Sequence, residues 1–348
     1  MAEGRTPTVP VIWCLLSAAL FGASTPASKL LLAEVGPLTL AGLLYLGAAL
    51  ATLPFATKGG SAGRRRDRTN LRRLAGAVLF GGVLGPVALL VGLRSSPSAS
   101  VSLWLNLETT ATALLAWRWF QENLGARGWL ANALVVLAGV LLAVPDGFTF
   151  APPALLVLLA CVCWGIDNNL TAVIDGYTPE QTTLAKGAVA GSVNLGLGLW
   201  LEGGTPGVGT VVGGLVVGSL AYGASIVLYI RGAQQLGATR SQMLFATAPF
   251  LGVLVAWVLV GEPVLAVQVA AALLMGGALA VLFSDRHEHD HVHPAQVHTH
   301  AHRHDDGHHD HRHPDIPAEA WHTHEHGHAE VRHRHPHVPD LHHRHRHR

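Results

Sequence analysis

Charged residues and histidine are scarce over most of this chain. Residues 1–284 hold 26 charged side chains, 15 basic and 11 acidic, and all 23 histidines come later. A soluble protein of this length would carry polar faces at helical spacing, and the scarcity of charge excludes that class. Cysteine is also rare: Cys14, Cys161 and Cys163 all lie inside apolar segments. Three residues in such settings do not form a disulfide framework, so we expect them to be packing residues.

Catalytic motifs are a further absence. The chain has no nucleotide-binding loop, no metalloprotease motif and no nucleophile elbow. We therefore do not expect an enzyme, and the same absence argues against ATP-driven transport by this chain alone.

Apolar segments fill the chain between Val11 and Phe283. A run of about 20 apolar residues crosses a bilayer as a helix, and ten such runs are present. They are 11–33, 37–57, 74–93, 97–117, 128–145, 153–174, 181–201, 209–230, 241–260 and 263–283. The first has Arg5 before it and small residues near Ala27, as a secretory signal does, but nine further runs favour an uncleaved signal anchor. We predict an all-α membrane protein with ten transmembrane helices.

Basic residues indicate the orientation. The loop between the second and third segments carries seven cations: Lys58, Arg64, Arg65, Arg66, Arg68, Arg72 and Arg73. Cytoplasmic loops are enriched in Lys and Arg, so this loop predicts a multi-pass protein of the cell membrane with both termini in the cytoplasm. Loops on the opposite side carry Glu34, Asp146, Glu202 and Glu262, with Arg94 as the one cation, whereas the nominally cytoplasmic loop 175–180 has no cation. Seven cations beside a span favour topology over a nucleic-acid patch, and we expect no nucleic-acid partner.

The chain contains an internal repeat. A shift of 140 positions places the fourth segment on the ninth, with Ala116-Trp117 on Ala256-Trp257 and Glu122 on Glu262. Two halves of five spans each have opposite orientations, because five is an odd number. The sequence therefore predicts an inverted repeat, an arrangement in which transporters bind substrate near the membrane midplane at the repeat interface.

These motifs resemble the EamA type of the drug/metabolite transporter superfamily, which has two five-helix repeats. Its W-G pair corresponds to Phe21-Gly22 and Trp164-Gly165. Its fourth-helix motif corresponds to Asn106-Leu107-Glu108 in the first repeat and Ala248-Pro249 in the second. The [GN]-E pair that follows this motif corresponds to Glu122 and Gly261-Glu262. The chain departs from the pattern where Thr109 replaces a proline and Ala248 replaces a polar residue. The resemblance implies transport and covers residues 11–283, but members move amino acids, metabolites, drugs and other solutes, so it leaves the substrate open.

Four regions follow from these observations. We expect a cytoplasmic N-terminus at 1–10, a first five-helix repeat at 11–145 and a second at 146–284. Residues 285–348 form a polar tail that cannot bury a core, and we expect this tail to be disordered.

Glu108 is the leading candidate for a functional carboxylate. It lies about eleven residues into the fourth segment, which at 1.5 Å per residue is near the midplane. A carboxylate at that depth is costly and is typical of a proton or cation pathway. The alternative is a structural hydrogen bond to a neighbouring helix. Asn106, two residues earlier, points to another side of the helix.

Asp167 and Lys186 form a second candidate site. Asp167 lies roughly 10 Å from the inner end of the sixth segment, and Lys186 reaches a similar depth in the seventh. Consecutive helices are usually neighbours, so the two can form an ion pair that a substrate or proton competes for. A static pair, or a Lys186 that extends to the headgroups, is the alternative. Nearby polar lining comes from Asn168, Asn169 and Asn194, whereas Lys29 lies near the outer end of its segment and is expected to extend to the surface.

Two further residues complete the substrate or coupling candidates: Trp164 of the W-G pair and Pro249. Pro26, Pro86 and Pro249 each remove a helical hydrogen bond and can kink a helix, which in a transporter exposes carbonyl groups or provides a hinge. Pro249 also matches the motif, and it is the proline to which we assign a role.

The tail contains several runs in which histidine alternates with other residues. Imidazole binds Zn, Cu, Ni and Co, and a flexible polyhistidine can gather several ligands around one divalent ion. No fixed four-ligand spacing is present, which argues against a structural zinc site. A low-complexity tail or a pH-responsive polycation is the alternative. The candidate ligands are His287, His289, His291, His293, His298, His300, His302, His304, His308, His309, His311, His313, His322, His324, His326 and His328.

Together these features predict a secondary active transporter in the lipid bilayer. We expect it to export a small organic metabolite or drug-like solute by alternating access at the repeat interface, without a required cofactor. A proton or cation co-substrate and a homodimer stay open. The alternative is a transporter of Ni, Co, Zn or Cu, or one regulated by metal, in which the tail buffers or senses the ion. The absence of histidine from the spans argues against metal as the primary cargo.

Overall fold

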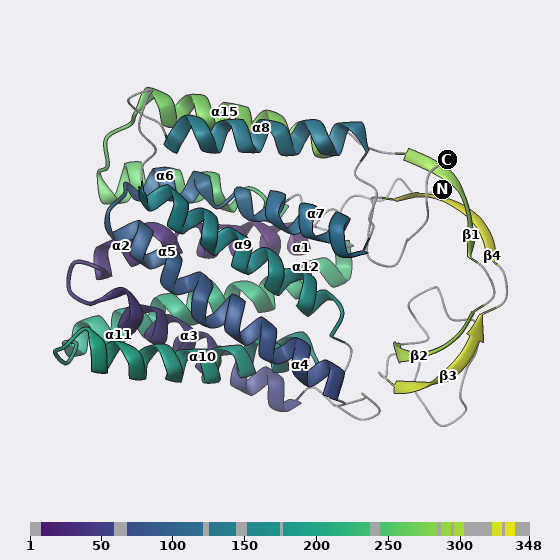
Figure 1. The fold of residues 1–348 in the computed structure, drawn as a ribbon, viewed down its shortest axis with the longest axis horizontal. Helices are drawn as coiled ribbons and strands as arrows, with labels where there is room; N and C mark the ends of the chain where they lie inside the picture. Colours follow the sequence, from purple (N-terminus) through teal and green to yellow (C-terminus); the bar gives the residue numbers. More distant parts are fainter. Residues whose placement is uncertain are drawn as a thin grey trace.

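The computed structural model describes residues 8–58, 68–120, 125–143, 152–174, 177–236, 244–283 and four strands in the tail. Helices occupy each of the ten predicted spans (Figure 1). In the first repeat they are α1 (Thr8–Gly22), α2 (Ser24–Leu31), α3 (Pro37–Lys58), α4 (Arg68–Ala77), η1 (Val78–Leu84), α5 (Gly85–Arg94), α6 (Ser98–Trp104), α7 (Leu107–Phe120) and α8 (Ala126–Ala143). In the second they are α9 (Pro152–Ala172), α10 (Pro179–Leu201), α11 (Val208–Gly218), η2 (Ser219–Ala224), α12 (Ser225–Leu236), α14 (Ala248–Val255), η3 (Ala256–Val260) and α15 (Ala266–Phe283).

Length and apolar composition support the membrane assignment. Seven helical runs among the described residues are long and apolar enough to cross a bilayer: Thr8–Leu31, Pro37–Ala56, Arg68–Arg94, Ala126–Ala143, Pro152–Ala172, Pro179–Leu201 and Val208–Gly232. Two shorter apolar helices, Ala248–Val260 and Ala266–Val281, occupy the ninth and tenth positions. The fourth position is divided between α6 and α7. The protein is therefore a multi-pass membrane protein built from helices.

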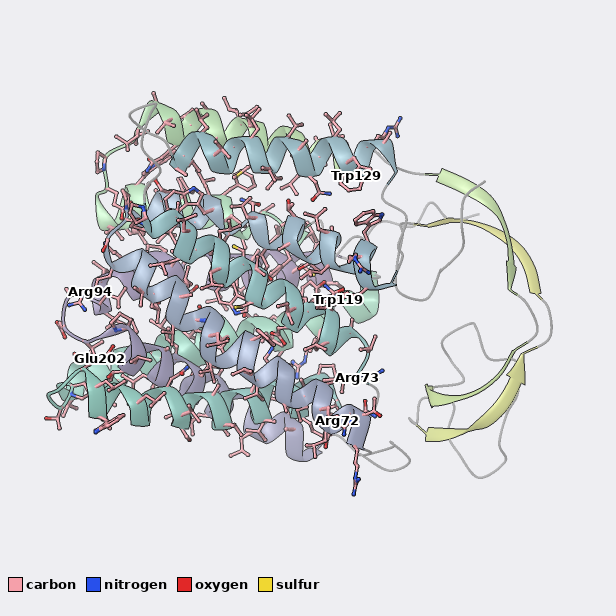
Figure 2. The ribbon with its side chains drawn as sticks, viewed as in Figure 1. Arg72, Arg73, Arg94, Trp119, Trp129 and Glu202 are labelled. Carbon is pink, nitrogen blue, oxygen red and sulfur yellow. The ribbon has the colours of Figure 1, made fainter. Side chains whose placement is uncertain are left out.

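The two ends of the bundle differ in their side chains. Arg72, Arg73, Trp119 and Trp129 lie at one end, which we call the Arg73 end (Figure 2). Arg94 and Glu202 lie at the opposite end, which we call the Glu202 end. Trp119 and Trp129 are exposed, as aromatic side chains are where a membrane helix meets the headgroups.

Helices of the two repeats pack against each other in matching pairs. The second helix of each repeat packs on its counterpart (α3 on α10), as do the fourth helices (α6 on α14) and the fifth (α8 on α15). The first helix of each repeat packs on the third of the other, α1 on α12 and α9 on α5. Figure 1 shows α8 and α15 side by side along one edge and α3 and α10 at the opposite edge. This reciprocal pairing is the pattern of two inverted repeats around a pseudo-two-fold axis.

Both fourth helices are interrupted at equivalent positions. In the first repeat a turn at Leu105-Asn106 separates α6 from α7, and in the second a turn at Ala246-Thr247 precedes α14. The shift of 140 found in the sequence places these turns one residue apart. The third helices also match, because the shift moves η1 onto η2, and both are π-helical. The repeat therefore preserves the irregularities of its helices as well as their number.

Three of the prolines in the spans lie near the start of a helical segment, whereas Pro54 lies inside α3. Pro249 and Pro86 occupy the first turns of α14 and α5, and Pro26 is the third residue of α2. The first turn of a helix has amide groups without helical partners, so a proline there costs no hydrogen bond. Pro249 follows the turn at Ala246-Thr247. Pro26 and Pro86 instead lie within the continuous helical runs Thr8–Leu31 and Arg68–Arg94, where we expect a proline to kink the helix.

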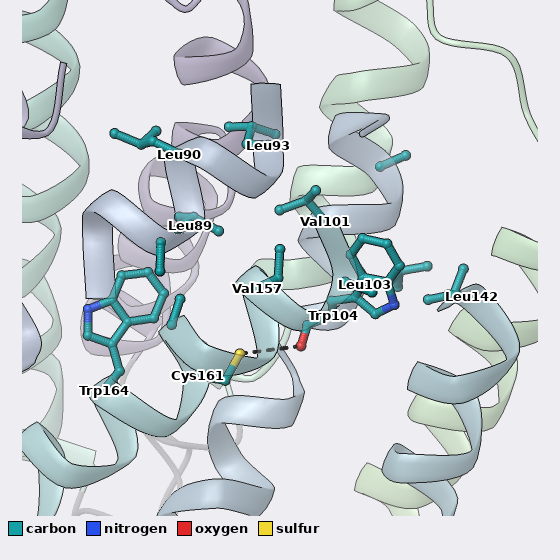
Figure 3. Packing of buried hydrophobic residues seen from close by; sticks show 14 of the residues in the cluster. Leu89, Leu90, Leu93, Val101, Leu103, Trp104, Leu142, Val157, Cys161 and Trp164 are labelled. Carbon is teal, nitrogen blue, oxygen red and sulfur yellow. Dashed lines mark hydrogen bonds between the residues drawn. The ribbon is translucent and has the colours of Figure 1, made fainter. Parts of the chain in front are cut away.

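Buried apolar side chains pack at the junction of the broken helix. Trp104, the last residue of α6, donates from Nε1 to Gly139 O at 3.1 Å, and its own carbonyl lies 3.6 Å from Cys161 Sγ (Figure 3). The carbonyl at the end of α6 has no continuing helix, so the thiol supplies a partner for it. Cys14, Cys161 and Cys163 are all buried and unbridged, which confirms that they pack in the interior.

The structure describes parts of the tail as two pairs of short strands. Four strands are present: β1 (His287–His293) pairs with β4 (Val331–His337), and β2 (Gln296–His302) pairs with β3 (His322–His328), both antiparallel. The physical reason lies in the alternating sequence, since a repeat of two residues matches the period of a strand. Composition predicted no buried core, and it gave no information on strand pairing.

Glycine allows α3 and α10 to approach closely. A Cβ atom added at Gly187 would lie 2.7 Å from Tyr45 O, and one added at Gly191 would lie 2.8 Å from Leu46 N. Backbone atoms cannot give way as flexible side chains do, so these positions require glycine. Small residues at such an interface let membrane helices pack through their backbones.

We therefore expect Gly187→Ala and Gly191→Ala to lower the melting temperature in detergent. Alanine is favoured over glycine in a helix by about 1 kcal/mol, so a loss of stability would come from the α3–α10 contact. Gly196→Ala is the matched control on the same helix, because no heavy atom lies within 4 Å of its added Cβ. If Gly196→Ala lowers the melting temperature as much as the other two substitutions do, this account of the interface is wrong.

Candidate functional site

The predicted ion pair is present near the centre of the bundle. Lys186 of α10 donates to Asp167 Oδ2 of α9, and Thr171 Oγ1 donates to Asp167 Oδ1 at 3.0 Å. The side chain of Asp167 is 6% exposed and that of Lys186 is 19% exposed. A Cβ at Gly81 would overlap the Asp167 carboxylate, so the glycine of η1 makes room for the pair. Two charges that are individually costly in a membrane are thus neutralised together.

Glu108 lies in the first turn of α7, directly after the interruption of the fourth helix. Asn168 Nδ2 donates to Glu108 Oε1 at 2.9 Å and to Thr112 Oγ1 at 3.2 Å. The Glu108 carboxylate also interacts electrostatically with Asp167 and Lys186. The structure therefore brings Glu108, Asn168 and the ion pair into one polar group across α7, α9 and α10.

Two other predicted residues bind carbonyl groups of η1. Gly81 O accepts from Trp164 Nε1 at 3.0 Å and from Tyr45 Oη at 2.5 Å. Gly82 O accepts from Asn194 Nδ2 at 3.0 Å. The π-helical turn thus presents two adjacent carbonyls to side chains of α3, α9 and α10. Trp164 and Asn194 therefore bind the backbone of η1 beside the ion pair. Among the described residues, Asn194 Oδ1 has no hydrogen-bond partner.

Asn106 and Pro249 lie apart from the polar group. Asn106 Nδ2 donates to Leu103 O at 3.1 Å and lies 3.4 Å from Met275 Sδ of α15. Its side chain therefore closes the turn between α6 and α7 and faces away from Glu108. Pro249 is the second residue of α14, at the position equivalent to Thr109, so it lies directly after the interruption of the ninth helix.

Sequence reasoning missed an aromatic cluster next to the polar group. Phe21 lies 5.8 Å from Tyr222 and 5.4 Å from Phe245, between ring centroids, and Tyr45 lies 5.8 Å from Tyr222. Phe245 also packs against Tyr229 at 5.1 Å. The cluster joins α1, α3, η2 and the interruption of the ninth helix. Phe21 of the W-G pair was the one signal in the sequence that pointed to it.

Carboxylates of the second repeat cap helices of the first at the Glu202 end. Glu262 accepts from Ser98 N at 2.7 Å, Ser98 Oγ at 2.6 Å and Ala99 N at 3.0 Å. Glu202 does the same at α3, accepting from Leu38 N at 2.7 Å and Thr39 N at 3.0 Å. A carboxylate at a helix N-terminus satisfies amide groups that have no helical partner. Glu122, the repeat counterpart of Glu262, lies outside the described residues.

Lys29 has a specific partner at the same end. Its Nζ donates to Leu93 O at 2.8 Å and Arg94 O at 2.9 Å, the last carbonyls of α5. We had expected this lysine to extend to the membrane surface. At this end the structure adds a specific role for the lysine, since cations bind the unsatisfied carbonyls at a helix C-terminus.

The described residues outside the tail offer no metal site. No group of three or more His, Cys, Asp or Glu side chains that could hold an ion occurs among the residues described. Cys161, which a metal route would need, donates to a backbone carbonyl. The alternative of a metal as cargo therefore gains no support from the spans.

Each of the two repeats matches a known family of proteins separately. The model of the EamA-like transporter family matches residues 8–144 and again residues 151–284. The chain belongs to the EamA-like transporter family. The resemblance drawn from the motifs is confirmed, and the protein is a membrane transporter of two repeats.

Two relatives are consistent with this assignment. An uncharacterized transporter of Methanothermobacter thermautotrophicus is 23% identical over 287 residues, which cover 76% of this chain and 82% of that protein. A solved structure, titled only as the crystal structure of a protein, aligns with a TM-score of 0.57 and 18% identity over 80% of this chain and 96% of its own. The second likeness supports the fold alone.

The ion pair predicts a specific pattern of mutant stability. Asp167→Asn or Lys186→Met alone should cost about 3–5 kcal/mol, because each leaves a buried charge without its partner. The double mutant should cost less than either single change. A double-mutant cycle by chemical denaturation in detergent measures the coupling free energy. Thr171→Val is the matched control, since it removes a hydrogen bond to Asp167 and leaves the charges paired. A coupling energy of zero would rule out a direct energetic role for the pair.

Proposed function

We propose that this transporter is a secondary active carrier of a small organic solute, with Glu108 as the carboxylate that binds the coupling proton. The observation that carries the proposal is the position of Glu108. It lies at a helix interruption, its hydrogen-bond partner Asn168 is an exposed neutral donor, and the nearby Asp167 is already paired with Lys186. Among these groups, Glu108 is the one whose charge can change without breaking an ion pair.

The chemistry beside Glu108 supports an organic solute with both a polar and an aromatic or apolar part. Polar groups come from α7, α9 and α10, and the rings of Phe21, Tyr222 and Phe245 come from the opposite helices. Tyr45 connects the two sides, since it packs on Tyr222 and interacts electrostatically with Asp167 and Glu108. Sites for small molecules typically combine apolar walls with a few polar groups in this way.

We propose that both termini lie in the cytoplasm of the cell membrane. The cations of the Arg73 end support this orientation through the positive-inside rule, with Glu202 and Glu262 then facing outward. Export is the direction we propose for the solute, and inward movement of protons through Glu108 would drive it. A proton rather than a metal cation fits best, because the spans lack a cluster of three ligands among the described residues.

Alternating access requires contacts between the repeats to form and break. We propose that the caps of Glu262 on α6 and Glu202 on α3 hold the outer end closed in this conformation. Both caps join the two repeats, and each consists of a carboxylate and backbone amides that water can replace. A Cβ atom added at Gly252 of α14 would lie 2.7 Å from Gly22 O and 2.8 Å from Ser102 Oγ, so α1, α6 and α14 approach one another closely there.

Transport in proteoliposomes tests the role of Glu108. We expect Glu108→Gln to fold and insert but to lose transport driven by a pH gradient, because the amide keeps a hydrogen-bond acceptor for Asn168 and cannot titrate. Thr112→Val is the matched control, since it removes the other acceptor of Asn168 and leaves the carboxylate. Uptake and efflux across a panel of organic solutes would be measured with and without the gradient. Gradient-driven transport by Glu108→Gln would remove this residue from the mechanism.

Cysteine accessibility tests the closed outer end. With Ser102→Cys as the reporter, we expect Glu262→Ala to increase labelling by an impermeant maleimide from outside the cell. Loss of a helix cap costs about 1 kcal/mol, which corresponds to a roughly five-fold shift toward the open form. Glu180→Ala, on α10 near the Arg73 end, is the control and should leave labelling unchanged. The same labelling rate for both variants would show that the cap does not hold the closure.

A further inference from the structure

Asn168 and Glu108 together present free hydrogen-bond acceptors. The Nδ2 group of Asn168 carries two hydrogens, and it donates to Glu108 Oε1 at 2.9 Å and to Thr112 Oγ1 at 3.2 Å. Both donor positions of the amide are therefore used. Within the part of the chain that the structure describes, neither Asn168 Oδ1 nor Glu108 Oε2 has a hydrogen-bond partner. With Glu108 ionised, a group that binds to these two atoms must donate hydrogen bonds.

These acceptors face the interior of the bundle. The titratable groups with which the Glu108 carboxylate interacts electrostatically lie on α3, α9, α10 and η2, and they are Tyr45, Cys161, Asp167, Lys186 and Tyr222. Glu108 therefore points across the bundle and not toward lipid. Asn168, its hydrogen-bond partner, is nevertheless exposed. A solute inside the bundle can thus reach the free carbonyl of this amide.

The charge of this polar group favours a cation. Asp167 and Lys186 neutralise each other, so an ionised Glu108 leaves the three side chains with a net negative charge. An anionic solute would place a second negative charge beside Glu108 in a medium of low dielectric constant, where like charges repel strongly. A solute with a single positive charge would instead neutralise the site.

Aromatic rings next to Glu108 favour the same charge. Tyr222 interacts electrostatically with Glu108, and its ring centroid lies 5.8 Å from that of Phe21 and 5.8 Å from that of Tyr45. The face of an aromatic ring attracts a cation within about 6 Å of its centre, and the ring also covers apolar parts of a ligand. The rings and the carboxylate therefore suit one class of organic solute.

We propose that the solute of this site is a monovalent organic amine with an aromatic or apolar body, bound in its protonated form. Its ammonium group donates to Glu108 Oε2 and Asn168 Oδ1, and its body packs on the rings of Phe21 and Tyr222. The N–H groups of the amine are essential, because a quaternary ammonium group has the charge but no hydrogen to donate. This inference rests on the proposed function, since it names the class of solute for the same site.

Probes that share a phenylethyl body test the solute class on the unmodified protein. They are 2-phenylethylammonium, its N,N,N-trimethyl derivative, 2-phenylethanol and 3-phenylpropanoate. Binding to the full-length protein in detergent would be measured by isothermal titration calorimetry at about pH 8.5, where a primary amine is still protonated. No gradient is present in this measurement, so it reports recognition of the solute and not coupling.

We expect 2-phenylethylammonium to bind more tightly than each of the other probes by about tenfold or more, because each of them lacks the charge, the N–H donors or both. Equal or tighter binding of the trimethyl derivative would overturn the role of the donors. Equal or tighter binding of the alcohol or the carboxylate would overturn the proposed charge. No binding of 2-phenylethylammonium at millimolar concentrations would overturn the proposal as a whole.

A matched pair of variants places the amine at Glu108. Glu108→Gln should weaken binding of 2-phenylethylammonium by about tenfold or more and leave binding of 2-phenylethanol unchanged, because the amide keeps the size of the side chain and loses its charge. Glu180→Gln makes the same substitution in the first turn of α10 and should change neither affinity. Equal effects of the two substitutions on the amine would overturn the placement.

The binding test and the transport test can fail separately. If Glu108→Gln loses the preference for the amine but keeps gradient-driven transport, Glu108 binds the solute without coupling it, and the amine stands while the coupling role falls. If Glu108→Gln loses gradient-driven transport while the unmodified protein binds all four probes equally, the coupling role stands and the amine is overturned.

Discussion

Every backbone amide and carbonyl inside a membrane needs a partner within the protein, and the irregular parts of this fold follow from that constraint. At several places where a described helix ends, is interrupted or is widened, a side chain from another helix binds the backbone group that is released. Trp164 and Tyr45 bind Gly81 O, and Lys29 binds the last carbonyls of α5. Glu202 and Glu262 bind the first amides of α3 and α6. These bonds cross between helices and, for the glutamates, between repeats, so satisfying the backbone also joins the two halves.

The repeats share geometry and differ in chemistry. Both fourth helices break at nearly the same position, but the first turn after the break carries Glu108 in one repeat and its counterpart Ala248, followed by Pro249, in the other. Both third helices contain a π-helical turn. The turn in the first repeat presents carbonyls to Trp164 and Asn194, whereas the turn in the second presents Tyr222 to Phe21. Both repeats contribute to each group, since Glu108 of the first repeat binds Asn168 of the second, and Phe21 of the first packs on Tyr222 of the second.

Much of this fold could be predicted from the sequence. The spans followed from long apolar runs, and the Asp167–Lys186 pair followed from depth and from the contact of consecutive helices. The caps could not be predicted in this way, because Glu262 lies 164 residues from Ser98 and periodicity gives no information on contacts at that separation. The π-helical turns also lack a signature, since Val, Leu, Phe and Gly occur equally in regular membrane helices. In the tail, composition indicated metal ligands and disorder, whereas the pairing of His291 with His333 depends on register, which composition does not determine.

The distribution of charge at the centre has a consequence for how such a carrier can work. Asp167 and Lys186 neutralise each other, so the pair can remain in the membrane in every state of the cycle at modest cost. Glu108 accepts its hydrogen bond from the neutral amide of Asn168, and that bond is available to a carboxylate and to a neutral acid alike. In the mechanism that we propose, the Asp167–Lys186 pair stays intact while Glu108 titrates, so protonation changes the net charge of the site by one unit without releasing Lys186. If Glu108 had been paired with the lysine instead, each proton taken up would have left a buried cation without a partner.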